Sequence, residues 1–325
     1  MYTIINGVKS NTRQINFGVP QGSVLGPLLF TLYINDIMYC IPKKHSRLFA
    51  DGTGIFESGP GLAQTINNAQ NLINKLKEWF YVNKLTINVP KCDWMVFHGK
   101  RKKLPLNIPA LYLGQEEIPR VYLFRYIGLT LDPSLSWKNQ INNICTRLNS
   151  FFGIFRYLRN KIPPAIKRQV YLSTASPILN YGIELYALSS SKLMNRLQSK
   201  QNQLLKVLYN KDWFYDSNLL HKECKLIKIK DLHELRVLTF VRKCLNKETI
   251  PLFHDYFSYK HTTHSHNTRN NLDLATLRSR TDYGGTRIKS IGARYWNSNK
   301  FAHNYLSFTI DAFKHNLKSN YIEKY

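Results

Sequence analysis

Asp51 is the residue whose type and setting best suit metal-assisted chemistry. It stands in the run Phe49-Ala50-Asp51-Gly52, with apolar segments on both sides. That pattern predicts a β-hairpin whose two-residue turn is Asp51-Gly52. A carboxylate at a hairpin tip is held rigidly yet stays open to a metal ion and a substrate. An ordinary Asp-Gly turn without chemistry fits the same residues, so both interpretations stay open here.

Two further polar stretches are candidates for binding. Lys100, Arg101, Lys102 and Lys103 form a basic cluster in an expected loop. This cluster could contact a phosphate backbone or be only a solvated turn. The run from His261 through His264 to His266 resembles a metal cluster, but no carboxylate or cysteine is there to complete a site. We therefore do not expect it to bind a metal.

A glycine-rich turn leading into an apolar helix is expected to organise the N-terminal part. Gly18, Gly22 and Gly26 permit backbone angles or close approaches that a Cβ would block. Pro27 suits the first helical turn, where its missing N–H costs nothing. Apolar residues then recur at helical spacing, which predicts a helix buried on most sides that runs to about Ile41 and is stopped by Pro42.

The rest of the chain predicts further strands and helices. Asn6-Gly7 indicates a hairpin turn within residues 1–17. We expect an amphipathic helix over residues 61–85, strands at 85–89 and 94–97, and a strand-rich segment at 121–132. Helical patterns dominate from Trp137 onward. They include a helix over 165–189 with a kink at Pro177, and helices over 192–208 and about 232–245.

Charge is the strongest signal of the composition. The chain has 46 Lys and Arg against 20 Asp and Glu, a net charge of +26, and 13% aromatic residues. Such an excess predicts an anionic partner, for which nucleic acid is the usual candidate, and aromatic residues can stack on exposed bases. Five scattered cysteines favour a reducing compartment and argue against a zinc knuckle. The expected location is intracellular, in the nucleus and cytoplasm. No segment is apolar enough to cross a membrane, and we expect no membrane partner.

Four motifs in order resemble those of reverse transcriptases, and most closely those of jockey-type non-LTR retrotransposons. The first is Gly18-Val19-Pro20-Gln21-Gly22 with the apolar helix that follows it. The second is Phe49-Ala50-Asp51. The third is the helix over 61–85, followed by a stretch from Leu85 to Lys91 and by Met95 to Phe97. The fourth is Tyr126-Ile127-Gly128 with Asp132. The resemblance implies an α+β fold: a partial palm of antiparallel sheet and helices, an α-helical thumb, and a mainly helical or irregular C-terminal region.

This resemblance also implies boundaries and roles. The palm would cover residues 1–132, the helical thumb 133–210, and the C-terminal region of the retroelement polyprotein 211–325. Gly18, Pro20, Gln21 and Gly22 would position template and nucleotide. Asp51 would be a catalytic Mg²⁺ ligand, and Lys91 a catalytic proton donor beside the departing pyrophosphate. Tyr126 and Gly128 would grip the primer end, while Lys100, Arg101, Lys102, Lys103, Arg147, Arg156 and Arg159 would bind nucleic acid.

The chain departs from the family pattern at its catalytic centre. Gly52 stands where the second aspartate of the motif is expected, and residues 1–17 contain neither Asp nor Glu to match the upstream aspartate. Two Mg²⁺ ions need several carboxylate oxygens, so Mg²⁺ is expected only if a complete site is assembled. We therefore expect that this chain does not polymerise alone.

The expected partners follow from these interpretations. They are an RNA template, an RNA–DNA or DNA duplex, and a protein partner at the palm edge that would lack its neighbouring strand. The alternative function is a non-catalytic nucleic-acid-binding protein derived from a retroelement.

Overall fold

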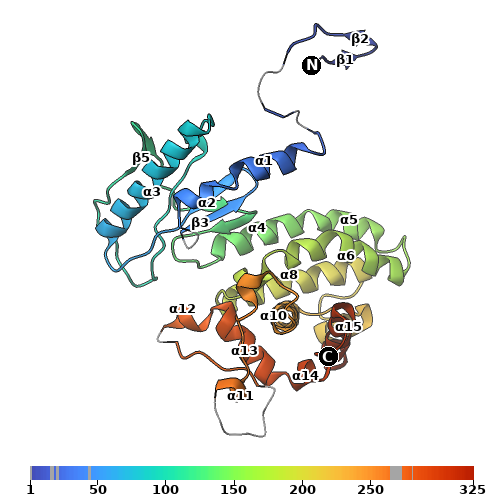
Figure 1. Cartoon of the computed structure of the whole chain (residues 1–325). Coiled ribbons are helices and arrows are strands. Elements are labelled where there is room, and N and C mark those ends of the chain that lie inside the picture. Colours follow the sequence, from blue (N-terminus) through green and yellow to red (C-terminus); the bar gives the residue numbers. More distant parts are fainter. Residues whose placement is uncertain (1, 15–17, 20–21, 43–44, 264–272, 280) are drawn as a thin grey trace. The chain divides into compact units, whose positions relative to one another are not determined.

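A computed structural model describes residues 2–14, 18–19, 22–42, 45–263, 273–279 and 281–325 (Figure 1). The chain divides into two units, residues 1–122 and 123–325. The division predicted at residues 132 and 210 stays a prediction about domains. The first unit contains β1 (Ile4–Ile5), β2 (Val8–Lys9), α1 (Gly26–Ile34), α2 (Ile37–Cys40), β3 (Ser46–Phe49), β4 (Gly52–Ile55), α3 (Leu62–Val82), the 3-10 helix η1 (Val89–Lys91), β5 (Leu111–Leu113) and β6 (Glu116–Ile118).

Helix α3 is the scaffold of the first unit. Its apolar residues recur every three or four positions, as predicted, and five of them are buried: Ile66, Leu72, Ile73, Leu76 and Trp79. One apolar cluster joins α3 to α1, α2 and the β3–β4 hairpin, and a second joins it to β5 and β6. Burial on α3 therefore fixes where the β3–β4 hairpin stands within this unit.

In the described parts of the chain, the strands form four separate two-stranded antiparallel sheets. A mixed fold of helices and small antiparallel sheets is thus confirmed, while the palm and thumb assignment stays a prediction. The strands predicted at 85–89 and 94–97 are wrong. Residues 89–91 form η1, and Trp94 makes one bridge, in which its N–H donates to the carbonyl oxygen of Pro119 at 3.1 Å. Apart from this bridge, no described strand pairs with either segment.

The apolar helix after Gly26 also differs from its prediction. It breaks at Asn35 and Asp36 into α1 and α2, and α2 ends before Pro42. In α1 the structure buries only Gly26 and Ile34 and leaves the larger apolar side chains at the surface. The exposed fractions are 56% for Leu28, 47% for Leu29 and 65% for Leu32. Because α1 is apolar around its whole circumference, packing on one side leaves the others exposed.

The second unit is mainly helical. It contains β7 (Phe124–Tyr126), β8 (Leu129–Leu131), α4 (Lys138–Asn149), α5 (Phe151–Leu158), α6 (Pro164–Asn180), α7 (Ile183–Tyr186), α8 (Ser191–Tyr209), α9 (Ser217–Cys224), α10 (Ile229–Leu245), the 3-10 helix η2 (Pro251–Phe253), α11 (Lys260–Thr263), α12 (Asp282–Gly285), α13 (Ile288–Ser298), α14 (Lys300–Asn304) and α15 (Ile310–Glu323). None of the described helices is long and apolar enough to span a membrane.

The helix predicted over 165–189 is two helices. Helix α6 continues through Pro177 and ends one turn later, where the N–H of Tyr181 bonds to the Pro177 carbonyl oxygen at 3.1 Å. Gly182 then adopts a φ of +70°, which turns the chain into α7. A Cβ at Gly182 would lie 2.7 Å from Leu129 Cδ2, so glycine is needed here for space as well.

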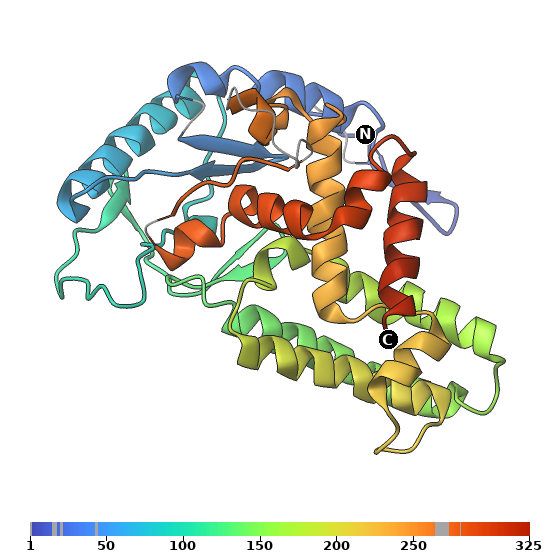
Figure 2. The same ribbon diagram turned by 90° about the horizontal axis from the view of Figure 1, so that it is seen from below.

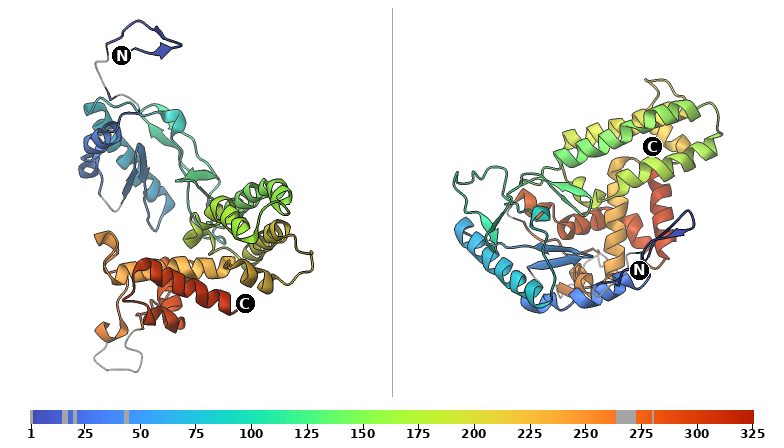
Figure 3. Two further views of the ribbon diagram at one scale, coloured as in Figure 1. Left: turned by 90° about the vertical axis from the view of Figure 1, so that its right-hand side faces the viewer. Right: turned by 90° about the horizontal axis from the view of Figure 1, so that it is seen from above.

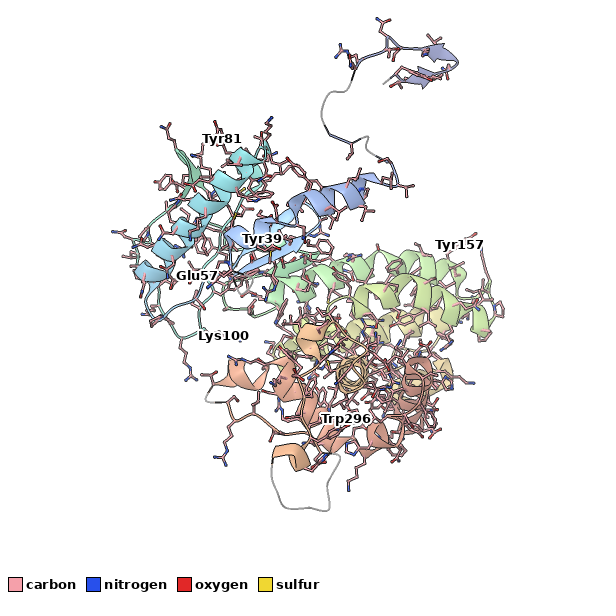
Figure 4. All side chains as sticks on the ribbon, viewed as in Figure 1. Tyr39, Glu57, Tyr81, Lys100, Tyr157 and Trp296 are labelled. Atoms are coloured by element: carbon pink, nitrogen blue, oxygen red, sulfur yellow. The ribbon has the colours of Figure 1, made fainter. Side chains whose placement is uncertain are left out.

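Helix α10 lies at the centre of the second unit and contacts α7, α8, α13 and α15. It crosses α13 and runs beside α15 in Figure 2, and the left view of Figure 3 shows α10 and α15 together. Val237, Leu238 and Val241 of α10 have no exposed surface. Gly292 of α13 allows the crossing, since a Cβ there would lie 2.8 Å from Val241 Cγ2 and from the Phe257 ring. Trp296, labelled in Figure 4, is fully buried one turn further along α13.

Candidate functional site

The glycine turn before α1 has the backbone geometry that its glycines predict. Gly18 has a φ of +80° and Gly22 a φ of +85°, both in the left-handed region. No atom lies within 4 Å of a Cβ built at either position, so conformation alone requires glycine. The Ser23 hydroxyl accepts a 3.0 Å hydrogen bond from the N–H of Gly26 at the start of α1. Pro20 and Gln21 lie outside the described residues.

Asp51 lies at the exposed tip of the β3–β4 hairpin. The hairpin is as predicted, but its turn is one residue earlier. Phe49 pairs with Gly52, so Ala50 and Asp51 form the two-residue turn, and Ala50 takes a left-handed φ of +51°. Gly52 is therefore the first residue of β4. Among the described residues, no hydrogen bond or ion pair ties up the Asp51 carboxylate, which leaves its oxygens open to a ligand.

The other carboxylates near this hairpin do not join Asp51. Glu57 follows β4, and its Oε2 lies 2.8 Å from Nδ1 of His45 at the end of the hairpin opposite the tip. Asp36 precedes α2 and makes no capping hydrogen bond. Within the part of the chain that the structure describes, no group of three or more His, Cys, Asp or Glu side chains is arranged to hold a metal ion.

Lys91 and the basic loop occupy other parts of the first unit. Lys91 is exposed at the end of η1, which contacts β6. No described interaction links it to Asp51. Lys100, Arg101, Lys102 and Lys103 are all exposed, in the loop marked by Lys100 in Figure 4. These cationic positions are thus exposed, but no described contact brings them to Asp51.

The β7–β8 hairpin carries Tyr126 and Gly128 and is fixed by helices of the second unit. Ile127 and Gly128 form its turn with φ values of +45° and +75°. The Tyr181 hydroxyl donates to the Ile127 carbonyl oxygen at 2.5 Å, and a Cβ at Gly128 would lie 3.1 Å from the Tyr181 ring. On the next strand, the N–H of Thr130 donates to Gln140 Oε1 at 2.9 Å. Helices α4 and α6 therefore hold this hairpin.

Asp132 builds the turn that connects β8 to α4. Its Oδ1 accepts hydrogen bonds from the N–H and hydroxyl of Ser134, and its Oδ2 accepts one from the Trp137 N–H at 3.2 Å. Partial burial alone would raise the pKa of the Asp132 carboxyl, but the hydrogen bonds from Ser136 and Ser134 outweigh it and lower that pKa. Sequence reasoning used Asp132 only as part of a motif and missed this local role.

The predicted nucleic-acid-binding arginines lie on α4, on α5 and directly after α5. Arg147 and Arg156 are exposed, and Arg159 is half-buried. Nearby, Lys161 Nζ lies 3.5 Å from the centre of the Tyr157 ring, which is 65% exposed and is labelled in Figure 4. This part of the unit thus combines exposed positive charge with an exposed aromatic ring. The region of His264 and His266 lies outside the described residues.

Comparison with known proteins supports the motif assignment. Residues 1–131 match the family described as reverse transcriptase (RNA-dependent DNA polymerase). The chain is 24% identical over 237 residues, 70% of its length, to the RNA-directed DNA polymerase from mobile element jockey of Drosophila melanogaster. It is 27% identical over 229 residues, 68% of its length, to the probable RNA-directed DNA polymerase from transposon X-element of the same species. The chain spans 25% of each of these two relatives.

A third relative matches a shorter part of the chain. Over 127 residues, 34% of this chain and 11% of the relative, the chain is 28% identical to the retrovirus-related Pol polyprotein from type-2 retrotransposable element R2DM of Drosophila melanogaster. No solved structure matches the chain. Together the matches confirm the resemblance drawn from the four motifs.

Proposed function

Because residues 1–131 belong to the reverse transcriptase family of non-LTR retrotransposons, we propose that the chain forms the template-, nucleotide- and primer-binding part of an RNA-directed DNA polymerase. The observation that carries this proposal is the exposed Asp51 carboxylate at a hairpin tip, within the matched residues and after a glycine turn with two left-handed residues. The turn at Gly18–Gly22 positions template and nucleotide, and Tyr126 and Gly128 hold the primer end.

The described residues do not by themselves fit a pair of Mg²⁺ ions. Mg²⁺ prefers octahedral oxygen ligands, and a two-ion site needs carboxylates that bridge or flank both ions. Asp51 supplies one carboxylate, Gly52 supplies none, and Glu57 is engaged by His45. Asp51 serves as a Mg²⁺ ligand only when further carboxylates complete the site. The 325 residues alone therefore bind a primer–template without extending it, and Lys91 acts only in the completed site.

The experiment that tests the binding role compares two nucleic acids with the whole chain. One is a DNA primer on an RNA template with a recessed 3′ end, and the other is a blunt RNA–DNA duplex of the same length. We expect tighter binding to the recessed end, and a photoreactive 3′-terminal nucleotide should crosslink to the peptide that holds Tyr126 and Gly128. Equal affinity for the two duplexes, with crosslinks elsewhere, would contradict the polymerase-derived role.

A second experiment tests the lack of extension. The chain is incubated with the primer–template, Mg²⁺ and deoxynucleotides, beside the variants Gly52→Asp and Asp51→Asn. A Cβ at Gly52 would lie 3.2 Å from the Phe49 carbonyl oxygen, so aspartate needs a shift of only a few tenths of an ångström there. We expect no extension by the unaltered chain. Extension that Asp51→Asn abolishes would show that the 325 residues hold a complete site.

The alternative is a non-catalytic nucleic-acid-binding protein, and the net charge of +26 with exposed Arg147 and Arg156 favours it specifically. A generic binder contacts phosphates and does not read a primer end. The two-duplex comparison separates the functions, because only the polymerase-derived role prefers the recessed end. For either function we propose the nucleus and cytoplasm as the location, and a protein partner at the hairpin sheets of the first unit.

A further inference from the structure

A cavity of about 390 Å³ opens in the second unit between α6, α8, α10 and α15. Its volume lies in the range of small-molecule sites. Apolar side chains form much of its lining: Leu179, Leu226, Ile227, Leu232 and Leu235. Tyr171 and Gln201 also line it, each only 2% exposed, and Gln201 Nε2 donates to the Tyr171 hydroxyl at 3.0 Å. Gln201 Nε2 also donates to the Ile227 carbonyl oxygen at 3.1 Å, and its Oε1 accepts from Gln198 Nε2 at 2.9 Å. The cavity therefore combines an apolar wall with two neutral polar side chains that are already held in place by hydrogen bonds.

The remaining side of the cavity is cationic. Arg236, Lys314 and Lys318 line it, with Asp311 as the one carboxylate among the described lining residues. Two of them have carboxylate partners: Arg236 Nε lies 2.8 Å from Glu184 Oε1, and Lys314 Nζ lies 3.3 Å from Asp311 Oδ1. Lys318 has no carboxylate partner among the described residues. Positive charge in this cavity is thus only partly neutralised by the protein.

A second cation, Arg168, lies near Lys318 and disfavours its charged form. Arg168 stands on α6 one turn before Leu172, which also lines the cavity. Burial lowers the pKa of the Lys318 ammonium, and the positive charge of Arg168 lowers it further. The described hydrogen bond of the Arg168 guanidinium is long, 3.5 Å from Nε to the Lys225 carbonyl oxygen. Arg168 is not itself a lining residue, but its guanidinium lies beside the lining, because Lys225 directly precedes Leu226. Two like charges near the same cavity are stabilised when an anion lies between them.

We propose that this cavity binds a nucleoside phosphate, with its phosphate at Lys318 and Arg168 and its base against the apolar lining beside Tyr171 and Gln201. An anion without an apolar body would leave the lining unfilled, and an apolar molecule would leave the two cations unpaired. A free nucleotide and the terminal nucleotide of a bound strand share this chemistry. The site uses none of the residues of the proposed polymerase role, so either proposal can fail without the other.

The test uses the whole chain and titration calorimetry with AMP, adenosine and inorganic phosphate. We expect saturable binding of AMP and weaker binding of adenosine and of phosphate, because each fills only part of the cavity. Lys318→Gln and Arg168→Gln should each weaken AMP binding about tenfold or more, the loss expected for one charge-assisted hydrogen bond. Lys318→Arg should largely retain binding. Lys222→Gln, an exposed position on α9 outside the cavity, is the matched control and should bind as the unaltered chain does.

Two further measurements keep the result interpretable. At one AMP concentration, the melting temperature of the unaltered chain and of Lys222→Gln should rise more than that of Lys318→Gln, with circular dichroism showing that all three fold. A 5′-phosphorylated trinucleotide that displaces AMP would identify a strand end as the natural occupant, and failure to displace it would identify a free nucleotide. The proposal is overturned if AMP does not saturate, if phosphate binds as tightly as AMP, or if Lys222→Gln loses as much affinity as Lys318→Gln.

Discussion

The hydroxyl of Tyr181 donates a hydrogen bond of 2.5 Å to the carbonyl oxygen of Ile127, so the end of α6 holds the turn of the β7–β8 hairpin. Both turn residues have left-handed φ values, and Tyr181 is packed against Gly128. The segment proposed to hold the primer end is therefore positioned by a residue at the end of α6, 54 positions later in the sequence.

Tyr181→Phe tests this contact. The variant keeps the ring beside Gly128 and loses only the hydrogen bond, which should cost about 1 kcal/mol of unfolding free energy. Hydrogen exchange of the amides at residues 127–128 should become faster, while exchange in α10 should not change beyond the global loss of stability. Unchanged exchange at the turn would show that other contacts hold it.

Asp132→Asn tests the carboxylate that builds the turn before α4. Since the folded-state pKa of Asp132 is lowered, its ionised form stabilises the fold above the usual carboxyl pKa of about 4. That contribution is lost as the pH falls through the lower folded-state pKa. Denaturant titrations should therefore show a stability gap between the chain and the variant at pH 7 that narrows below about pH 4. A gap independent of pH would mean that shape, not charge, matters.

Gly182→Ala should destabilise the second unit. The new Cβ would lie 2.7 Å from Leu129 Cδ2, and alanine would have to adopt a φ of +70°. Strain and overpacking of this kind cost about 1–3 kcal/mol. Gly153→Ala in α5 is the control, because nothing lies within 4 Å of its Cβ and helix propensity predicts a gain of up to about 1 kcal/mol. Thermal unfolding should show a lower melting temperature for Gly182→Ala and an equal or higher one for Gly153→Ala.

His221 should make the second unit sensitive to mild acid. Its side chain is fully buried, and Nδ1 lies 3.0 Å from the Leu226 carbonyl oxygen. Burial lowers the pKa of His221 to about 4, the hydrogen bond to Leu226 opposes this, and the charge of Lys228 adds to it. The folded state then takes up a proton less readily than the unfolded chain, so stability falls as the pH drops below about 6.5.

The expected size of that effect is about 2 kcal/mol between pH 7.5 and pH 5, from the pKa difference between the two states. His221→Gln should lose correspondingly less stability over the same interval, although it starts from a lower value. Chemical denaturation at the two pH values measures how much unfolding free energy the chain and the variant each lose. If the chain and the variant lose the same unfolding free energy between the two pH values, the acid sensitivity belongs to other groups. His233 is the first to examine, because burial lowers its pKa to about 4 as well.

Arg147→Gln combined with Arg156→Gln tests the cationic face of α4 and α5. If both arginines contact phosphates, the slope of log affinity against log salt for an RNA–DNA duplex should decrease by about 1.5 to 2. The double variant Lys222→Gln with Lys230→Gln removes the same charge from exposed positions on α9 and α10 and should change the slope less. Equal slopes for the two double variants would indicate a diffuse electrostatic field instead of a defined contact face.

Sequence reasoning succeeded where one element carries its own signal. The period of apolar residues defined α3, Asn6-Gly7 marked a real hairpin turn, and the segment predicted to be strand-rich contains β7 and β8. Sequence reasoning failed where the structure of a segment depends on which other parts of the chain pair or pack with it. The segments around Leu85 and Trp94 read as strands but lack a pairing strand among the described residues, and α1 reads as buried although its leucines are exposed.

The same reasoning explains what could be predicted of the two sites. The hairpin at Asp51 followed from local sequence, with an error of one residue in its turn, while the position of Gly128 followed from the resemblance to the family motif. The cavity could not be predicted, because its lining comes from four helices that are distant in sequence. Nothing local to Lys318 indicates that Arg168 lies near it, 150 residues earlier in the chain.

The close crossing of α10 and α13 also limits how this sequence can change over generations. Gly292 leaves no room for a side chain as long as Val241 and Phe257 keep their present size. A larger residue at 292 requires a smaller one at 241 or 257 in the same lineage. These three positions should consequently vary together among closely related sequences, while the exposed residues between them vary independently.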